Sequence, residues 1–565
     1  MKWRQKNPCL RSIEDVVRAN TGMTIEELNE EKEYRIEKMP QAASLIHDAV
    51  RDNKRICVVT DYDADGICSA AIMKLVLESL GADFRIRIPK RISEGYGLSA
   101  SIVEEFPNDA LLVCVDNGIT AFEAITEAKK RGMTAIILDH HMLPEDGRIP
   151  PADVVIDPAA IGEADFLHYC GAGLAYKLAV HILRKNHSCI AKCLSFAAIA
   201  TVADVMPLLG ENRLIVKKGL KSMMLDRGRT HGLSALMKQN GFESAITEQN
   251  LGFKIAPCLN APGRLYDDGA TDSYRLLVCE NPAEASILAA KILQVNELRK
   301  QKKDEGVLTL RENIKRNNLY DDVPLVLYEP GLDEGLVGLF AGHFAEELKR
   351  PCIVFTDAED AYDTKMKVLK GSARSHGDVH LKNLLDKNAS LILKFGGHKG
   401  AAGLSINKEN LEAFRHALKK SIESMDISDE NYYDLEVCAK SVPTLIAKLE
   451  EFAPFGEGNP EIMFKVKDFE VSLTHKGYVT TMSNGKHGKV VNRDGVSAVA
   501  FDMGESLARA VDGKPKTLTL YGKLAMNISQ FGKFKQIQAE DFEVQESTVQ
   551  TTQLATKLRL AAKKY

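Results

Sequence analysis

Short apolar runs that each stop at an aspartate, separated by stretches of helical periodicity, constrain the fold of this chain more than any other feature. Three runs have this form: 56–60 before Asp61, 110–115 before Asp116 and 134–138 before Asp139. Helical patterns cover 66–80 and 121–131, and a further apolar run covers 84–88. This alternation predicts βαβ units and a parallel sheet that is buried on both faces.

The three aspartates occupy equivalent positions, directly after the last apolar residue of each predicted strand. In a parallel sheet the carboxyl ends of the strands meet at one edge, and ligands bind at that edge. We therefore expect the sheet to bring the three acidic motifs together in one site.

The rest of the chain changes in pattern several times, as expected for 565 residues, which are too many for one hydrophobic core. One long helix, interrupted only by Gly306, is predicted over 281–317, and short alternating runs after residue 430 predict a small β-barrel. The predicted regions are an N-terminal segment 1–45, a parallel-sheet α/β domain 46–280, a connecting helix 281–318, a smaller α/β domain 319–428, a β-barrel domain 429–548 and a basic tail 549–565.

Composition narrows the class of protein. The net charge is only −4, so a nucleic-acid surface must be a local basic channel. No stretch approaches the roughly 20 apolar residues that span a bilayer, and the first residues lack the pattern of a signal peptide. The eleven cysteines are scattered, and the pair Cys189 and Cys193 has no second pair to complete a zinc site. We expect reduced thiols and a cytoplasmic protein without a membrane partner.

The first acidic cluster places Asp61, Asp63 and Asp65 at alternate positions after a strand, and Gly66 permits a tight turn into the next helix. Carboxylates at this spacing offer the hard oxygen ligands that Mg²⁺ and Mn²⁺ prefer. A solvated acidic turn is the alternative. An EF-hand loop is excluded because no glutamate occupies its closing position.

Three further motifs carry candidate ligands: Asp116, the triplet Asp139-His140-His141, and Asp204. Exposed loop histidines are the alternative for the second motif. Asp204 interrupts an apolar context, where an unpaired carboxylate is costly, so that a metal ion or a set of hydrogen bonds must compensate.

In this order and at strand ends, the four motifs resemble those of the DHH phosphoesterases. Two later blocks, at 371–375 and 396–403, resemble the companion substrate-binding domain called DHHA1, and blocks at 259–264 and 454–460 resemble the RecJ exonucleases more narrowly. The resemblance runs from about residue 54 to residue 544. It implies a DHH domain, a DHHA1 domain and an oligonucleotide-binding (OB) barrel.

The resemblance implies a centre of two metal ions. Asp63 and Asp65 would bind different ions, Asp116 would bridge them, and His140 and Asp204 would complete one of them. The remaining residues of the centre would be Asp61 as a nearby ligand, His141 facing the scissile phosphate and Asp139 orienting its neighbours. The mixed ligands favour Mn²⁺, with Mg²⁺ as the alternative.

The resemblance also implies substrate-binding residues. Arg264, Ser372 and Arg374 match positions that receive a terminal phosphate, which arginine forks suit. Arg91 and Tyr96 match a narrow entrance where a ring stacks on a base, whereas the residues alone favour a buried turn tyrosine at Tyr96. The other candidates are His398 at a phosphate and, in the barrel, Phe531, Phe534 and Tyr478, for which core packing is an equal alternative.

The activity so implied is 5′-to-3′ hydrolysis of single-stranded DNA in recombination and repair, by a monomer that cooperates with a single-strand-binding protein and a helicase. A relative that cleaves short RNA or cyclic dinucleotides is the second hypothesis, but such relatives lack the barrel. A catalytically inactive single-strand-binding factor is the third, disfavoured because all the ligand residues are present. A pyrophosphatase is set aside because Val59 stands where that family carries a histidine.

Overall fold

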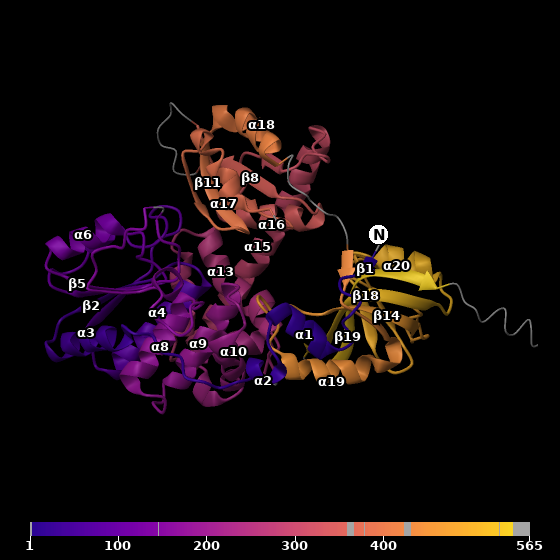
Figure 1. The fold of residues 1–565 in the computed structure, drawn as a ribbon, viewed down its shortest axis with the longest axis horizontal. Helices are drawn as coiled ribbons and strands as arrows, with labels where there is room; N and C mark the ends of the chain where they lie inside the picture. Colours follow the sequence, from indigo (N-terminus) through magenta and orange to yellow (C-terminus); the bar gives the residue numbers. More distant parts are fainter. Residues whose placement is uncertain are drawn as a thin grey trace, which may run out of the picture.

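The structure is a computed structural model that describes residues 3–144, 146–243, 245–358, 367–377, 379–422, 431–529 and 532–545. The predicted basic tail 549–565 and Phe531 lie outside the described residues. Figure 1 shows three lobes, with the first sheet in purple, the second sheet in orange and a β-rich lobe in yellow, around the helices α13 and α15.

The first sheet confirms the predicted parallel arrangement. Its five strands run in the order β3-β2-β4-β5-β6, and every neighbouring pair is parallel. The strands are β2 (Ile56–Val59), β3 (Phe84–Arg87), β4 (Leu111–Val115), β5 (Thr134–Leu138) and β6 (Val154–Ile156). Residues that alternate along β2 and β4 enter two different cores, so both faces are covered.

Helices cover the first sheet on both sides. One face packs against α3 (Met39–Arg51), α4 (Ala64–Ser79) and α8 (Gly171–Leu183). The other packs against α5 (Ala100–Glu104) and α6 (Phe122–Lys130). Beyond the first face lie α9 (Ile190–Ala203), α10 (Gly210–Met223), α11 (His231–Gln239), α12 (Glu248–Asn250), a π-helical turn (Leu251–Ile255), α13 (Ala256–Leu265) and α14 (Gly269–Leu277). The short helix α7 (Pro158–Ile161) packs its Ile161 against the core on the other face.

The long helix α15 (Pro282–Arg316) confirms the predicted connection. Its first half contributes Leu288 and Ile292 to the core of the first sheet, and its last half contributes Leu310 and Ile314 to the core of the second. Because its ends belong to different cores, the helix sets the distance between the two sheets.

The second sheet has the order β10-β11-β9-β8-β7, with only β7 and β8 parallel. Its elements are β7 (Leu325–Tyr328), α16 (Val337–Glu347), β8 (Cys352–Asp357), β9 (Val368–Arg374), α17 (Leu381–Asp386), β10 (Lys394–Gly397), β11 (Ala401–Asn407) and α18 (Leu411–Ile422). This lobe confirms the predicted smaller α/β fold.

The β-domain is the seven-stranded sheet of order β13-β14-β18-β19-β17-β16-β15, with two helices. It confirms the predicted β-rich end of the chain. Its elements are β13 (Leu435–Cys438), α19 (Val442–Phe452), β14 (Met463–Glu470), β15 (Thr480–Met482), β16 (His487–Val491), β17 (Ser497–Ala500), α20 (Gly504–Val511), β18 (Thr517–Ser529) and β19 (Gly532–Gln545).

The first residues of the chain pack on the β-domain, which the sequence did not indicate. Strand β1 (Trp3–Gln5) pairs in parallel with β12 (Asn431–Tyr433), and the Trp3 ring stacks on Tyr521 with centroids 4.7 Å apart. The helices α1 (Ile13–Thr21) and α2 (Ile25–Leu28) also contribute to the β-domain core. In Figure 1 the N-terminus accordingly lies beside β18. Across the residues described, no helix is long and apolar enough to cross a membrane.

Candidate metal centre and substrate entrance

The turn between β2 and α4 presents the first acidic cluster. Asp63 is the N-cap of α4, and its carboxylate accepts hydrogen bonds from the backbone amides of Asp65 (2.9 Å) and Gly66 (3.2 Å). A Cβ atom at Gly66 would lie 2.1 Å from the Asp61 carbonyl oxygen. Only glycine therefore allows the helix to begin this close to the strand end.

The N-terminus of α8 holds the Asp65 carboxylate in place. Its two oxygens accept from the amides of Gly171 and Ala172, each at 2.7 Å. These donors and the positive end of the helix stabilise a carboxylate that is buried. The sequence analysis missed this contact, because the partners are more than 100 positions apart and Gly171-Ala172 resembles any small-residue helix start.

Asp116 follows β4 with a left-handed φ of +63°. This conformation is uncommon for a residue other than glycine, although aspartate tolerates it better than most. Gly171 allows the close approach of α8, since a Cβ there would lie 2.4 Å from the Asp116 Cβ. Asp116 is consequently buried at the centre of the site.

All six predicted metal-ligand residues meet at the carboxyl edge of the first sheet. His140 Nε2 lies 3.0 Å from Asp116, 3.6 Å from Asp65 and 3.7 Å from Asp204. Three groups have ligand atoms within 4.8 Å of one another: Asp61-Asp63-Asp116, Asp65-His140-Asp204 and Asp116-His140-His141. Asp116 and His140 each belong to two of these groups.

The electrostatics of this cluster fit a divalent cation. Burial raises the pKa of Asp61, Asp65, Asp116 and Asp204, and neighbouring carboxylates raise it further. Asp61 Oδ1 is buried and has no hydrogen-bond partner among the described residues. A cation would both neutralise the carboxylates and give this oxygen a partner, and the mixed oxygen and imidazole donors suit Mn²⁺ or Mg²⁺.

Asp139 and His141 interact with each other beside the other candidate ligands. The Asp139 carboxylate accepts from the Ile119 amide at 2.9 Å and contacts His141 Nδ1 at 2.7 Å. Burial alone would lower the pKa of His141, but the hydrogen bond and charge of Asp139 raise it to about 9. Asp139 thus favours the protonated form of His141 in the metal-free protein.

Tyr96 lies at the mouth of the site. Its hydroxyl donates to the Asp116 carbonyl oxygen at 2.9 Å and lies 3.0 Å from a ring nitrogen of His141. The residue is 45% exposed, so the interpretation of a buried turn tyrosine is wrong. The adjacent glycines, Gly95 and Gly97, both adopt positive φ, which glycine reaches without strain.

The loop that carries Arg91 and Tyr96 is fastened by Asp267, which the sequence analysis missed. The Asp267 carboxylate accepts from the amides of Ile92 (2.8 Å) and Ser93 (3.0 Å) and from the Ser93 hydroxyl (2.6 Å). The Arg91 guanidinium lies 4.7 Å from the centre of the Tyr62 ring, next to the acidic cluster. Asp267 thereby ties the entrance loop to the end of α13.

An arginine cluster adjoins the entrance loop. Burial and then the positive charges of Arg91, Arg299 and Arg374 lower the pKa of Arg264 to about 9. Arg374 donates to the Ser372 hydroxyl at 3.0 Å. The structure therefore brings together the residues predicted to receive a terminal phosphate. It adds Arg299 of α15, whose only sequence signal was a charged run.

His398 lies in the turn between β10 and β11, where its Nδ1 accepts from the Gly400 amide at 3.2 Å. Burial, and then the positive charge of Arg374, lower its pKa. His398 thus borders the arginine cluster. In the β-domain, Phe534 is 45% exposed, whereas Tyr478 packs against the core. Of these two candidates, Phe534 is therefore the one whose ring is accessible to a base.

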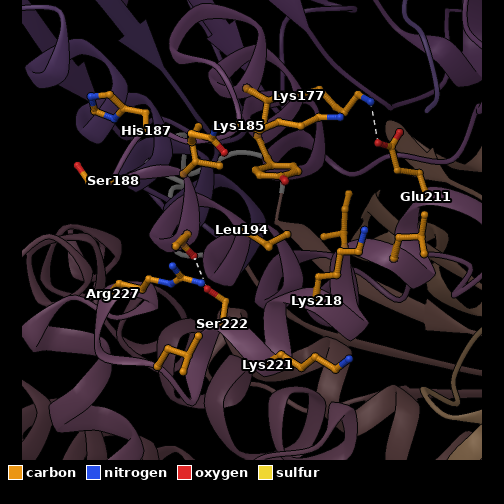
Figure 2. A pocket seen from close by; sticks show the side chains of 18 of the residues that line it. Lys177, Lys185, His187, Ser188, Leu194, Glu211, Lys218, Lys221, Ser222 and Arg227 are labelled. Carbon is orange, nitrogen blue, oxygen red and sulfur yellow. Dashed lines mark hydrogen bonds and ion pairs between the residues drawn. The ribbon is translucent and has the colours of Figure 1, made fainter. Parts of the chain in front are cut away.

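A separate cavity of about 830 Å³ lies among α8, α9 and α10. Figure 2 shows Lys177 and Lys185 on one side of this cavity and Lys218 and Lys221 on the other, with Leu194 between the two sides. Lys177 forms an ion pair with Glu211. None of the predicted site residues lines it, so it is distinct from the metal centre.

Comparison with known families matches three parts of the chain. Residues 55–201 match the N-terminal domain of the DHH family, residues 322–424 match the DHHA1 domain and residues 433–541 match the RecJ OB domain. The first match covers Asp61, Asp63, Asp65, Asp116 and His140 of the candidate metal centre, and the second covers Ser372, Arg374 and His398.

Curated relatives and solved structures cover most of the chain. The single-stranded-DNA-specific exonuclease RecJ of Dickeya dadantii is 32% identical over 75% of this chain and 77% of its own. That of Haemophilus influenzae is 30% identical over 85% and 86%. The crystal structure of RecJ with Mn²⁺ from Thermus thermophilus aligns with a TM-score of 0.75 at 26% identity, over 94% of this chain and 76% of that one. The same protein with Mg²⁺ aligns with a TM-score of 0.70 at 25% identity, over 94% and 74%.

Proposed function

The chain belongs to the RecJ family of single-stranded-DNA-specific exonucleases, and from this premise we propose that it hydrolyses single-stranded DNA from the 5′ end to mononucleotides. The observation that carries the proposal is the overlap of the ligand groups at Asp116 and His140, beside an arginine cluster. Overlapping ligand groups suit two cations that act on one phosphate.

Two Mn²⁺ ions are proposed as the cofactor, with Mg²⁺ as the alternative. Asp61 and Asp63 would hold one ion, and Asp65, His140 and Asp204 the other, with Asp116 shared between them. Two divalent cations in such a site lower the pKa of a shared water and stabilise the charge of the leaving oxygen.

The chain's own groups supply orientation and charge. Asp139 orients His141 through its contact with Nδ1, so that the other ring nitrogen can donate a hydrogen bond to a phosphate oxygen at the scissile position. The Tyr96 hydroxyl limits the rotation of His141 through its contact with that ring. The N-terminus of α8 holds Asp65 toward the ligands.

The polarity of the reaction is assigned to the arginine cluster. Arg264, Ser372 and Arg374 would receive the 5′-terminal phosphate, with His398 at its border, because arginine forks bind phosphate in a fixed geometry. Arg91 and Tyr96 would form an entrance that admits one strand, with the exposed Tyr96 ring stacking on a base.

The β-domain distinguishes this proposal from its alternatives. A relative that cleaves short RNA or cyclic dinucleotides needs no OB domain, whereas residues 433–541 match one. An inactive strand-binding factor would lack ligands, whereas the six candidate ligand residues are all present and lie close enough together to hold metal ions, which supports an enzyme. We propose a monomer that acts in the cytoplasm in DNA recombination and repair, with a single-strand-binding protein and a helicase as partners.

The test is digestion of single-stranded DNA labelled separately at each end, with duplex DNA and RNA as controls and with Mn²⁺ or Mg²⁺. The informative variant is Asp116→Asn, because asparagine tolerates the positive φ of this position and removes only the charge. Asp109→Asn is the matched control, since Asp109 also has a positive φ, at the opposite end of β4.

Mononucleotide release from the 5′ end of single-stranded DNA, lost in Asp116→Asn and retained in Asp109→Asn, supports the proposal. Cleavage restricted to short RNA would transfer the assignment to the second hypothesis. Strand binding without cleavage under either metal would leave an inactive binding factor.

A further inference from the structure

The segment that follows the candidate ligand Asp204 enters the junction with the β-domain. The Leu208 amide donates to the Glu457 carbonyl oxygen at 2.7 Å. Leu209, the next residue, packs against the β-domain core. The chain therefore runs within five residues from the metal centre into a different core.

The β-domain meets this segment with the turn 454–460, a motif that the proposed function leaves without a role. A Cβ atom at Gly456 would lie 2.8 Å from the Leu208 side chain. At Gly458, where φ is +74°, a Cβ would lie 3.2 Å from Leu209 and 3.3 Å from Pro207. Both glycines are therefore needed for the turn to lie this close to the Asp204 segment.

Arg213 of α10 holds the same turn from the other side. Its guanidinium donates to the carbonyl oxygens of Ala453 (2.8 Å) and Pro454 (3.1 Å) and to the Asn29 side chain (3.4 Å). The side chain is fully buried, and among the described residues no carboxylate lies within ion-pair distance of it. A buried cation is costly unless hydrogen-bond acceptors such as backbone oxygens compensate its charge. Arg213 therefore holds the turn in position and adds little to the overall stability of the fold.

A left-handed residue lies between Asp204 and the junction. Val205 has a φ of +54° because it closes α9, where the amides of Val205 and Met206 donate to the carbonyl oxygens of Val202 (3.2 Å) and Thr201 (3.0 Å). Helix α9 ends at Asp204 on one side, and the junction holds Leu208 on the other. The cap of α9 thus fixes the start of the 205–209 segment, beside Asp204, and the junction fixes its end.

We propose that the turn 454–460 and Arg213 are positioning elements of the metal centre. By holding the 205–209 segment, they set the place of the Asp204 carboxylate, 3.7 Å from His140. The β-domain then contributes to metal binding as well as to strand binding. The consequence of this inference for catalysis rests on the proposed function, whereas the effect of the turn on metal affinity does not.

The test compares two glycine substitutions with equal backbone strain in the full-length protein. Gly458→Ala introduces a methyl group against Leu209 and Pro207, whereas Gly495→Ala has a φ of +75° and nothing within 4 Å. Mn²⁺ affinity is measured by electron paramagnetic resonance of free ion during titration, with thermal unfolding alongside. We expect Gly458→Ala to weaken Mn²⁺ binding about tenfold, as does the loss of supporting contacts at other metal sites, and Gly495→Ala to leave it unchanged.

A double-mutant cycle identifies the route. If the turn acts through Asp204, Gly458→Ala has no further effect on Mn²⁺ affinity in an Asp204→Asn background. Arg213→Gln carries the same cycle if Gly458→Ala does not fold. Equal Mn²⁺ affinity in wild type and both folded variants, or an undiminished effect in the Asp204→Asn background, would overturn the inference. Wild-type protein that binds Mn²⁺ but cleaves no nucleic acid would instead overturn the proposed function alone.

Discussion

The Asp267 carboxylate accepts hydrogen bonds from both the backbone amide and the hydroxyl of Ser93. A residue three positions after Arg264 therefore fastens the loop that carries Arg91 and Tyr96. Asp267 thus links the predicted entrance to the predicted phosphate pocket. Their spacing depends on a carboxylate that contacts neither of the predicted functional groups directly.

Loss of this anchor should loosen the entrance. Asp267→Ala leaves two amides and a hydroxyl without their acceptor, at a cost of about 1–3 kcal/mol for each group that stays buried. We expect a higher KM for single-stranded DNA, a smaller change in kcat and weaker discrimination against duplex ends. Steady-state kinetics on both substrates measure this. Asp268→Ala, an exposed neighbour without contact to the loop, should behave as wild type.

The ring and the hydroxyl of Tyr96 should have separable effects. Tyr96→Phe keeps the ring and removes the contacts to Asp116 and His141, so kcat should fall while KM stays near the wild-type value. Tyr96→Ala also removes the stacking surface, which is worth about 1–3 kcal/mol per base, so KM should rise about tenfold or more. Equal KM values for the two variants would contradict base stacking at this ring.

Stabilisation by metal should depend on pH. Burial raises the pKa of the carboxyl groups of Asp61, Asp65, Asp116 and Asp204 in the metal-free protein. Such groups bind protons more tightly in the folded state, so their contribution to stability is greatest below the ordinary carboxyl pKa. It is lost as pH rises through the raised values. Bound Mn²⁺ replaces these protons, so the increase in Tm on adding Mn²⁺ should be larger at about pH 8 than at about pH 5.5. Differential scanning fluorimetry checks this, and an increase that shrinks with rising pH would argue against the ligand set.

We expect Arg264 to contribute to phosphate recognition without contributing to the stability of the fold. Burial and then neighbouring positive charges lower the pKa of its guanidinium to about 9, so Arg264→Met removes the cost of a buried charge together with this repulsion and should leave Tm unchanged or higher. The preference for a 5′-phosphate over a 5′-hydroxyl end should fall about tenfold or more, the value of a charged hydrogen bond. Competition between the two substrates measures this preference. Arg275→Met, an exposed surface arginine, serves as the control.

Much of the site followed from local pattern. The strands β2, β4 and β5 end where their apolar runs end, and parallel pairing then places Asp61, Asp116 and Asp139 at one edge. The long helix α15 could also be predicted, because helical periodicity without proline is a local property of the sequence. These features depend on residues close together in the chain, so the sequence by itself determined them.

Only the tertiary structure decided which distant segments support the site. The amides of Gly171 and Ala172 reach Asp65 across more than 100 residues, and Asp267 reaches Ser93 across 174. Trp3 packs against Tyr521 although they belong to opposite ends of the chain. Single hydrogen bonds and ring contacts of this kind leave no periodicity in the sequence, because their partners are selected by the packing of whole elements. The candidate ligands could therefore be named from the sequence, whereas the groups that hold them in place could not.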